Sequence, residues 1–420
     1  MFSDIYFHIV AIIYLASLLL FVYFKSNKKI NVTFYIVGVY LASVIGGLFL
    51  DSTLAVPPNS YSLWATFLFL LLITLFFVPL VLSKTESIKH VQCPNYKLFD
   101  AVCYFFILIG IAAYLYFPPI IYTMLVSLGT LNVRGIDTGF EGNLLYLFLT
   151  LGCQFFPIVL LFYFHSVCYR PGRVWFNRLL LFSSTAYIIN VLTVMGRDGF
   201  VLWAMSYIFA FILYKNILPS QVKVKTKKTF TIFLSFFLVI FFLISISRFY
   251  DDDGGTYFLF QKLLLYFSQQ FGEFNRFVNV VQRSYVDVGS VFPLVDLFGA
   301  PKERKSFLTA HYSFISQYGF SQNVFKTFLG DFYNNLGLLI TFFVSCLFAF
   351  LFSIQSLVGG VSNIKLGKLI LLTVFSQVVL HGIFYFKLAY MVSNIYVIIC
   401  LLLSIVFSYN LVSHREQTRK

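Results

Sequence analysis

The sequence is short of charged residues, and this scarcity excludes an ordinary soluble globular protein. Only 11% of its 420 residues are Asp, Glu, Lys or Arg, whereas 60% are hydrophobic, and the mean hydropathy is +0.86. Soluble domains carry about 25% charged residues. The apolar runs are long and continuous rather than short and alternating, which argues against an outer-membrane barrel. We therefore expect an all-α polytopic membrane protein.

Motifs for nucleotide, metal and disulfide chemistry are also missing. The sequence has no P-loop, no dinucleotide-binding glycine pattern and no zinc motif. Its six cysteines show no metal-ligand spacing and indicate no disulfide framework. No internal repeat is visible, and the first residues lack the basic region and cleavage site of a signal peptide. We expect the first apolar run to be retained.

Long apolar runs predict about eleven transmembrane helices, each near the roughly 20 residues that a bilayer requires. The expected spans are 5–24, 31–50, 62–83, 98–117, 144–165, 179–195, 200–215, 230–247, 335–355, 367–386 and 389–409. One long stretch, 248–334, is not a span. The expected organisation is thus a membrane bundle over 1–247, a large loop over 248–334 and a second bundle over 335–420.

The basic residues predict the orientation. Most of them lie in six segments: 25–29, 84–97, 170–178, 215–228, 365–368 and 415–420. With eleven spans all six fall on one side, and Lys and Arg concentrate in cytoplasmic loops. We therefore expect an outer N-terminus, a cytoplasmic C-terminus and an extracytoplasmic 248–334 loop. The net charge of +14 is then a topology signal and not a footprint for nucleic acid.

The large loop is where function is expected, because loops of this length between spans are usually functional. Apolar residues recur every three or four positions over 257–282, which predicts an amphipathic helix. This helix either lies at the membrane surface or packs on the bundle. Pro and Gly punctuate 289–305, which predicts a loop, and 306–329 predicts one or two short helices. A second outer loop, 118–143, opens as a candidate re-entrant or interfacial segment.

Five arginines on the expected outer face are candidates for binding a phosphate or diphosphate. Arg197 stands in Gly196-Arg197-Asp198-Gly199, just before an expected span. Its guanidinium would lie beside free helix N–H groups and a positive dipole end. Alternatively, Asp198 caps the helix and Arg197 reaches lipid headgroups. The other four candidates, each also explicable as a solvated or lipid-facing charge, are Arg134, Arg248, Arg276 and Arg283.

Three residues are candidates for general-base catalysis. His311, in Thr309-Ala310-His311-Tyr312, is the only histidine of the large loop. An imidazole accepts protons near neutral pH, although a packed histidine would fit as well. Glu273 and Asp331 are alternatives, and Glu273 is spaced to pair with Arg276 at i, i+3. The run 251–253, Asp-Asp-Asp, fits a solvated turn better than a cation site.

Taken together, these features resemble the Wzy-type O-antigen and capsule repeat-unit polymerases. The resemblance lies in the many spans, the late outer loop, Gly196-Arg197-Asp198-Gly199, and Gly330-Asp331-Phe332-Tyr333-Asn334-Asn335-Leu336-Gly337 before the next span. The segment around His311 is similar to a loop of the related O-antigen ligases, where Asn commonly stands at the position of Tyr312.

The resemblance implies a GT-C-like glycosyltransferase in the bacterial inner (plasma) membrane, working without a metal or other cofactor. Its substrates would be undecaprenyl-diphosphate-linked oligosaccharides within the lipid bilayer, and a chain-length regulator is a candidate partner. The growing glycan would move to a terminal sugar hydroxyl of a new lipid-linked unit. Arginines would stabilise the leaving diphosphate, with His311 as base and Glu273 second. An O-antigen ligase, a lipid-linked oligosaccharide flippase or transporter, and a non-catalytic assembly partner stay open, although transporters usually show repeats and midplane charges.

Overall fold

The computed structural model describes residues 2–53, 61–127, 143–194, 196–249, 261, 264–281, 287–298, 307–318, 325–357 and 362–408. The chain folds into two compact units. Unit 1 comprises Met1–Glu86, Leu243–Gly359 and Ser376–Asn394, and unit 2 comprises Ser87–Phe242, Gly360–Phe375 and Ile395–Lys420. These units are defined by contacts within the fold. The expected boundaries at 247 and 334 separate membrane spans from a loop, and the contact-based units do not test them.

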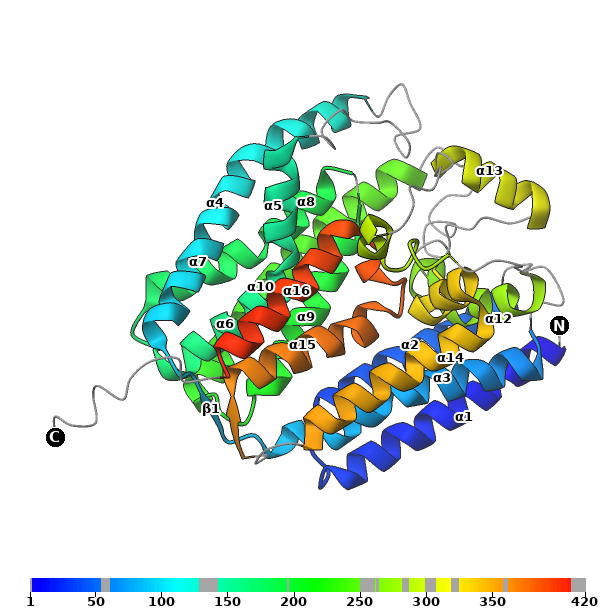
Figure 1. Cartoon of the computed structure of the whole chain (residues 1–420), viewed down its shortest axis with the longest axis horizontal. Helices are drawn as coiled ribbons and strands as arrows, with labels where there is room; N and C mark the ends of the chain where they lie inside the picture. The colour runs from blue at the N-terminus through cyan, green and yellow to red at the C-terminus, as the bar shows by residue number, and fades with distance from the viewer. Residues whose placement is uncertain are drawn as a thin grey trace. The chain divides into compact units, whose positions relative to one another are not determined.

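Unit 1 is built around four long helices that run alongside one another (Figure 1). They are α1 (Phe2–Lys25), α2 (Val32–Thr53), α3 (Leu63–Leu82) and α14 (Thr327–Leu357). Its shorter elements are α12 (Gln270–Val280), α13 (Phe307–Tyr318), and the 3-10 helices η1 (Thr85–Ser87, at the boundary with unit 2), η2 (Pro293–Phe298) and η3 (Lys387–Ala389). Aromatic side chains pack against one another in its interior. For example, the ring centroids of Phe76 and Phe328 are 4.7 Å apart.

Unit 2 contains most of the remaining helices. They are α4 (Tyr96–Ser127), α5 (Leu144–Gln154), α6 (Phe156–Tyr169), α7 (Val174–Ser184), α8 (Ala186–Leu192), α9 (Asp198–Tyr214), α10 (Ser220–Phe249), α15 (Leu366–His381) and α16 (Met391–Val406). The last three begin or end in unit 1. Two short strands, β1 (His90–Gln92) and β2 (Asn363–Lys365), pair in parallel with His90 opposite Asn363.

The expected class, an all-α polytopic membrane protein, is confirmed. Among the described residues, six helices are long and apolar enough to cross a membrane, or seven if the bent pair α5 and α6 forms one span. The other expected spans coincide with shorter helices, of which α9, α15 and α16 are apolar. The total of eleven spans and the extracytoplasmic position of the large loop stay predictions.

Several helices break or extend where the apolar pattern alone gives no sign. The expected span 144–165 bends by 48° between α5 and α6, because Pro157 at the start of α6 has no N–H to continue the preceding helix. In contrast, α4 continues through Pro118 and Pro119 to Ser127, where an outer loop was expected. Helix α14 begins at Thr327, before the expected residue 335, and is kinked at Gly337 with φ 72° and ψ 176°. Only glycine adopts such a conformation without strain.

Candidate functional site

Helix α12, from the large loop, is fixed to the bundle of unit 1 by polar side chains. Three hydrogen bonds tie it to α2 and to the start of α3: Ser43 Oγ to Gln270 Oε1 (2.7 Å), Thr66 Oγ1 to Asn275 Oδ1 (3.2 Å) and Ser62 Oγ to Asn279 Oδ1 (2.7 Å). Gln270 and Asn275 are fully buried. Buried amides require such partners, so these bonds fix the packing position of α12, which we call its seat. Of the two expected placements, packing on the bundle is the one found.

The apolar face of α12 completes this seat. Phe271, Phe274 and Phe277 are buried, as the three- and four-residue spacing predicts. Within the predicted 257–282 stretch, residues 264–268 and 270–280 are helical, with an interruption at Gln269. Residues 257–260 and 262–263 lie outside the described part of the chain.

Two glycines of α2 let the segment before α12 approach closely. A Cβ atom at Gly46 would lie 2.0 Å from Ser268 Oγ, and one at Gly47 would lie 2.9 Å from the Ser268 carbonyl oxygen. Beside them, His8 Nε2 lies 2.9 Å from Tyr61 Oη and its ring packs edge-on against Phe271. The loop segment is therefore in direct contact with α1, α2 and the residues preceding α3.

Two ion pairs lie on neighbouring elements, one on α12 and one at the start of α14, which contacts α12. Arg276 Nη1 is 3.2 Å from Glu273 Oε1, and Lys326 Nζ is 3.0 Å from Asp331 Oδ1. Lys326 Nζ also lies 4.5 Å from the centroid of the Phe277 ring. Glu273 is one turn before Phe277 on α12, so the ring that Lys326 contacts belongs to the same helix as the first pair. We call Glu273, Arg276, Lys326 and Asp331 the loop cluster.

The start of α14 is held by backbone bonds to the segment after α15. The Phe328 N–H donates to Gly382 O (2.7 Å), and the Thr327 N–H donates to Phe384 O (3.2 Å). The second carboxylate oxygen of Asp331 accepts the Phe386 N–H at 2.7 Å. Thr327 has a φ of 66°, which is strained for a β-branched residue. Such strain persists only where surrounding contacts impose it, and it is common at functional sites.

The loop cluster combines low exposure with balanced charge. The side chains of Lys326 and Arg276 are 6% and 15% exposed, and those of Glu273 and Asp331 are 12% and 21% exposed. Each cation faces a carboxylate, so an anionic ligand would have to displace Glu273 or Asp331 from it. The arrangement can therefore exchange a carboxylate for an anionic ligand at each cation.

The predicted base His311 lies on α13, a helix that contacts α12. Phe314 stacks on Phe277 with ring centroids 5.8 Å apart, and Tyr318 packs beside Phe314. Residue 311 is three positions, about one helical turn, before Phe314. The side chains of 301–312 lie outside the described part of the structure, so the role of His311 stays a prediction.

The predicted diphosphate ligands are divided between the units. Arg197 belongs to unit 2, where it precedes α9 and its guanidinium carbon lies 5.8 Å from the Phe241 ring centroid. Asp198 is the first residue of α9 and not its cap, and its charge still suits the helix dipole. The side chains of Arg134, Arg248 and Arg283 are outside the described residues. Of the predicted site residues, the structure pairs Glu273 with Arg276 and places Asp331 on α14, a helix that contacts α12.

Lys326 is the member of the loop cluster that the sequence analysis missed. It is a lone cation in an aromatic stretch, five residues before Asp331 and shortly before an apolar run. A single charge at such a boundary is costly enough to mark a functional candidate. That signal was present in the sequence, but the pairing with Asp331 forms only in the folded chain, where tertiary contacts hold Thr327 at a φ of 66°.

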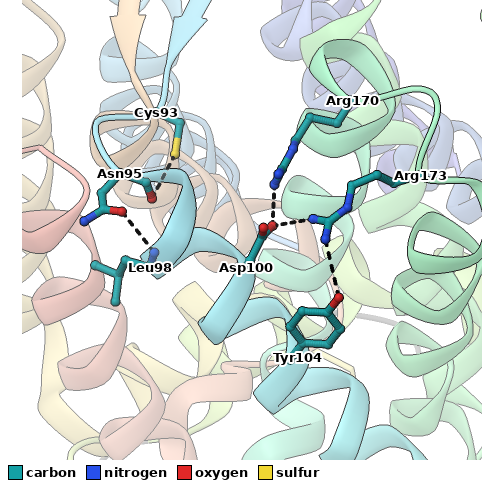
Figure 2. A network of polar contacts seen from close by, with 7 residues as sticks. All are labelled: Cys93, Asn95, Leu98, Asp100, Tyr104, Arg170 and Arg173. Atoms are coloured by element: carbon teal, nitrogen blue, oxygen red, sulfur yellow. Dashed lines mark hydrogen bonds and ion pairs between the residues drawn. The ribbon is translucent and has the colours of Figure 1, made fainter.

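A second polar network lies in unit 2, at basic segments expected in the cytoplasm. Figure 2 shows Asp100 of α4 between Arg170 and Arg173 of the α6–α7 turn. Arg173 Nη1 lies 2.8 Å from the Asp100 carboxylate, and Arg173 Nη2 donates to Tyr104 Oη at 3.4 Å. Arg170 forms an ion pair with the same carboxylate oxygen. The network clamps α4 to the α6–α7 turn.

The same network contains a cysteine at the start of α4. Cys93 Sγ donates to the Asn95 carbonyl oxygen at 3.7 Å, and Asn95 Oδ1 accepts the Leu98 N–H at 3.1 Å as a helix cap (Figure 2). Burial raises the pKa of the Cys93 thiol to about 11, and the Arg170 guanidinium, which acts in the opposite direction, does not offset it. This thiol is therefore protonated at neutral pH and is a poor nucleophile.

Comparisons of the chain with protein-family models, with curated proteins and with solved structures gave no match. Any assignment of function therefore rests on the residues of this chain and their arrangement.

Proposed function

We propose that this protein is a membrane glycosyltransferase that polymerises undecaprenyl-diphosphate-linked oligosaccharide repeat units at the outer face of the bacterial inner membrane. The loop cluster is the observation that carries the proposal. It offers two nearly buried cations for a diphosphate, Arg276 and Lys326, each paired with a carboxylate that can exchange. Buried charges near a membrane boundary are costly, which favours a function for them.

The position of α12 within unit 1 supports an outer site. It contacts His8 near the start of α1, Ser43 in the second half of α2 and Ser62 before α3. Ser268, just before α12, lies against Gly46 of α2. The opposite ends of these helices carry Lys25, Lys28, Lys29 and Lys84. Figure 1 shows α12 and the N-terminus at the same end of this bundle. On the positive-inside rule the lysine end is cytoplasmic, so the α12 end is extracytoplasmic.

The proposed chemistry is transfer of a glycan between two lipid-linked substrates. The terminal sugar hydroxyl of the new unit attacks the anomeric carbon of the growing glycan. As the new C–O bond forms, the bond to the lipid diphosphate breaks, and undecaprenyl diphosphate leaves with the electron pair. The hydroxyl proton passes to a base, His311 first and Glu273 second. Arg276 and Lys326 stabilise the charge that develops on the diphosphate, a type of contribution worth about 3 kcal/mol per group.

The test is the surface glycan of a deletion strain complemented with defined variants. We expect the wild-type gene to restore a ladder of polymer lengths on a gel. Arg276→Ala, Arg197→Ala and His311→Ala should each leave a single displayed repeat unit at normal protein level. Arg178→Ala is the control, because Arg178 lies on α7, stacks on Trp175 and is not one of the predicted site residues. It should keep the ladder.

Other outcomes would contradict the proposal in distinguishable ways. Lipid-linked units trapped inside the membrane would indicate a flippase or transporter. Full-length polymer on its lipid carrier without attachment to the final acceptor would indicate a ligase. A normal ladder with Arg276→Ala and Arg197→Ala would remove the diphosphate-binding role from both residues.

A further inference from the structure

Helix α10 carries a basic segment directly before an apolar one. Five lysines occur between 215 and 228, and no Asp or Glu occurs from 199 to 250. The helix runs from Ser220 to Phe249, and its 220–243 stretch is long and apolar enough to cross a membrane. The lysines from 223 to 228 are therefore on the same helix as the apolar residues. When that helix spans the bilayer, they lie at the height of the lipid headgroups.

Contacts with α9 fix which side of α10 faces the protein. Tyr207 Oη donates to the Thr226 carbonyl oxygen at 3.2 Å, and the Tyr207 ring stacks on Phe230 at 4.7 Å. One turn further, the Phe233 ring lies 5.9 Å from Trp203. Residues 226, 230 and 233 follow helical spacing and form one face. The opposite side of α10 consequently faces away from α9.

That outward side combines two cations with an apolar stripe. Lys225 and Lys228 are exposed, and Ile232, Phe236 and Val239 are 60%, 60% and 58% exposed. These positions are separated by three or four residues, so they lie on one face of the helix. The lysines are at one end of the apolar stripe. A phospholipid has the same arrangement, with its headgroup phosphate at one end and its acyl chains extending from it.

The two lysines are not neutralised by the protein around them. Among the residues that the structure describes, no carboxylate is paired with Lys225 or Lys228. A Lys near a membrane surface contributes roughly 1 kcal/mol to the attraction for anionic lipid. A zwitterionic headgroup, with no net charge, gains little from the same pair of cations.

We propose that the outward face of α10 is a binding site for an anionic phospholipid. Lys225 and Lys228 hold the headgroup phosphate, and the acyl chains lie along Ile232, Phe236 and Val239. A phospholipid fits better than a protein ligand, because the apolar stripe continues down a helix that is suited to cross the bilayer. The site is separate from the loop cluster and does not depend on the proposed function.

The test measures lipid binding to the purified full chain by native mass spectrometry. The probes are phosphatidylglycerol and phosphatidylcholine with identical acyl chains. The wild type should prefer phosphatidylglycerol, and the double variant Lys225→Gln/Lys228→Gln should lose on the order of tenfold of that affinity. The matched control Lys28→Gln/Lys29→Gln, two exposed lysines after α1 in unit 1, should keep the preference. Lys225→Arg/Lys228→Arg should keep it too.

Two results would overturn the proposal. One is a wild type without preference between the two lipids. The other is a double Gln variant that binds phosphatidylglycerol as tightly as the control. Unfolding midpoints measured in phosphatidylcholine check that the variants are folded. If the double Gln variant is unfolded, the single variants Lys225→Gln and Lys228→Gln decide: each should lose part of the preference, and an unchanged preference in both would overturn the proposal.

Discussion

At the scale of single residues, Lys326 carries the highest cost of burial. Of the Asp, Glu, Lys and Arg residues that the structure describes, it alone is buried. An isolated ammonium in an apolar interior would lose its proton or destabilise the fold. Asp331 at 3.0 Å and the face of Phe277 provide its environment. The stability of this part of the chain should therefore depend on the pair and not on either residue alone.

A double-mutant cycle tests this dependence. Asp331→Asn leaves Lys326 buried without its counterion, so we expect a loss of about 3 kcal/mol in the free energy of unfolding. Adding Lys326→Met to that variant removes the uncompensated charge while keeping the volume. The double variant should be more stable than Asp331→Asn alone. The measurement is reversible unfolding in detergent, and additive losses would contradict the coupling.

The Cys93 thiol gives a prediction for pH dependence. An ordinary cysteine has a pKa of about 8.5, whereas burial raises the pKa of Cys93 to about 11. The thiolate is the reactive form, and a raised pKa delays its formation. Alkylation of Cys93 by iodoacetamide should be slow at pH 7 and rise about tenfold per pH unit up to pH 9.5 without a plateau.

Peptide mapping after alkylation separates Cys93 from the other five cysteines. The control is the same chain unfolded in sodium dodecyl sulfate, where the rate at Cys93 should level off near the ordinary pKa. A plateau below pH 9 in the folded protein would show that the thiol is not held protonated by burial.

At the scale of elements, the seat of α12 depends on small residues in α2. A Cβ at Gly46 would meet Ser268 Oγ at 2.0 Å, so Gly46→Ala should displace the 264–268 turn and lower stability by roughly 1–3 kcal/mol. The loop cluster moves with α12, so glycan polymerisation should fall as well. Gly38→Ala on the same helix is the control, because its nearest contact, Leu19 Cδ1, is 4.0 Å away. It should be neutral or stabilising by about 0.5–1 kcal/mol.

Unfolding and the glycan ladder are measured together for both variants. Equal stability and equal ladders for Gly46→Ala and Gly38→Ala would mean that the segment before α12 is not seated on α2.

The positions of the helices were largely predictable from the sequence, whereas their bends and exact ends were less predictable. Lipid requires long apolar helices with satisfied backbones, so hydropathy locates α1 to α4 well. The interruption between α5 and α6 also had a local signal in Pro157, which is compatible with either a kink or a helix start. The early start of α14 had none, because its first backbone N–H groups bond to Gly382 and Phe384. Such bonds join residues distant in sequence and follow only from tertiary packing.

The same limit applies to the candidate site. Glu273, Arg276 and Asp331 were identifiable as charges in an apolar chain, and the i, i+3 spacing predicted the Glu273–Arg276 pair, which is confirmed. The contact between Lys326 and Phe277 joins α12 to α14 across nearly 50 residues, and no local pattern encodes it. The parallel pairing of β1 with β2 is longer-ranged still.

At the scale of the whole molecule, orientation in the membrane decides whether the loop cluster can meet exported lipid-linked substrates. Within unit 1, Ser290 belongs to the large loop and is exposed, and Lys28 is exposed in the turn after α1. The excess of Lys and Arg on one side predicts that position 28 is cytoplasmic and position 290 is outside. A membrane-impermeant maleimide added to spheroplasts should therefore label Ser290→Cys and not Lys28→Cys.

Permeabilised cells are the positive control, in which both variants should be labelled, and the parent chain gives the background from its own cysteines. Labelling of Lys28→Cys alone in sealed spheroplasts would invert the protein and place the loop cluster in the cytoplasm. The proposed polymerase would then have no access to exported repeat units. Labelling of both positions in sealed cells would mean that the two ends of unit 1 are on one side, which is incompatible with α1, α2 and α3 crossing the bilayer as single spans. Only the first pattern leaves the loop cluster in the compartment where exported lipid-linked substrates are found.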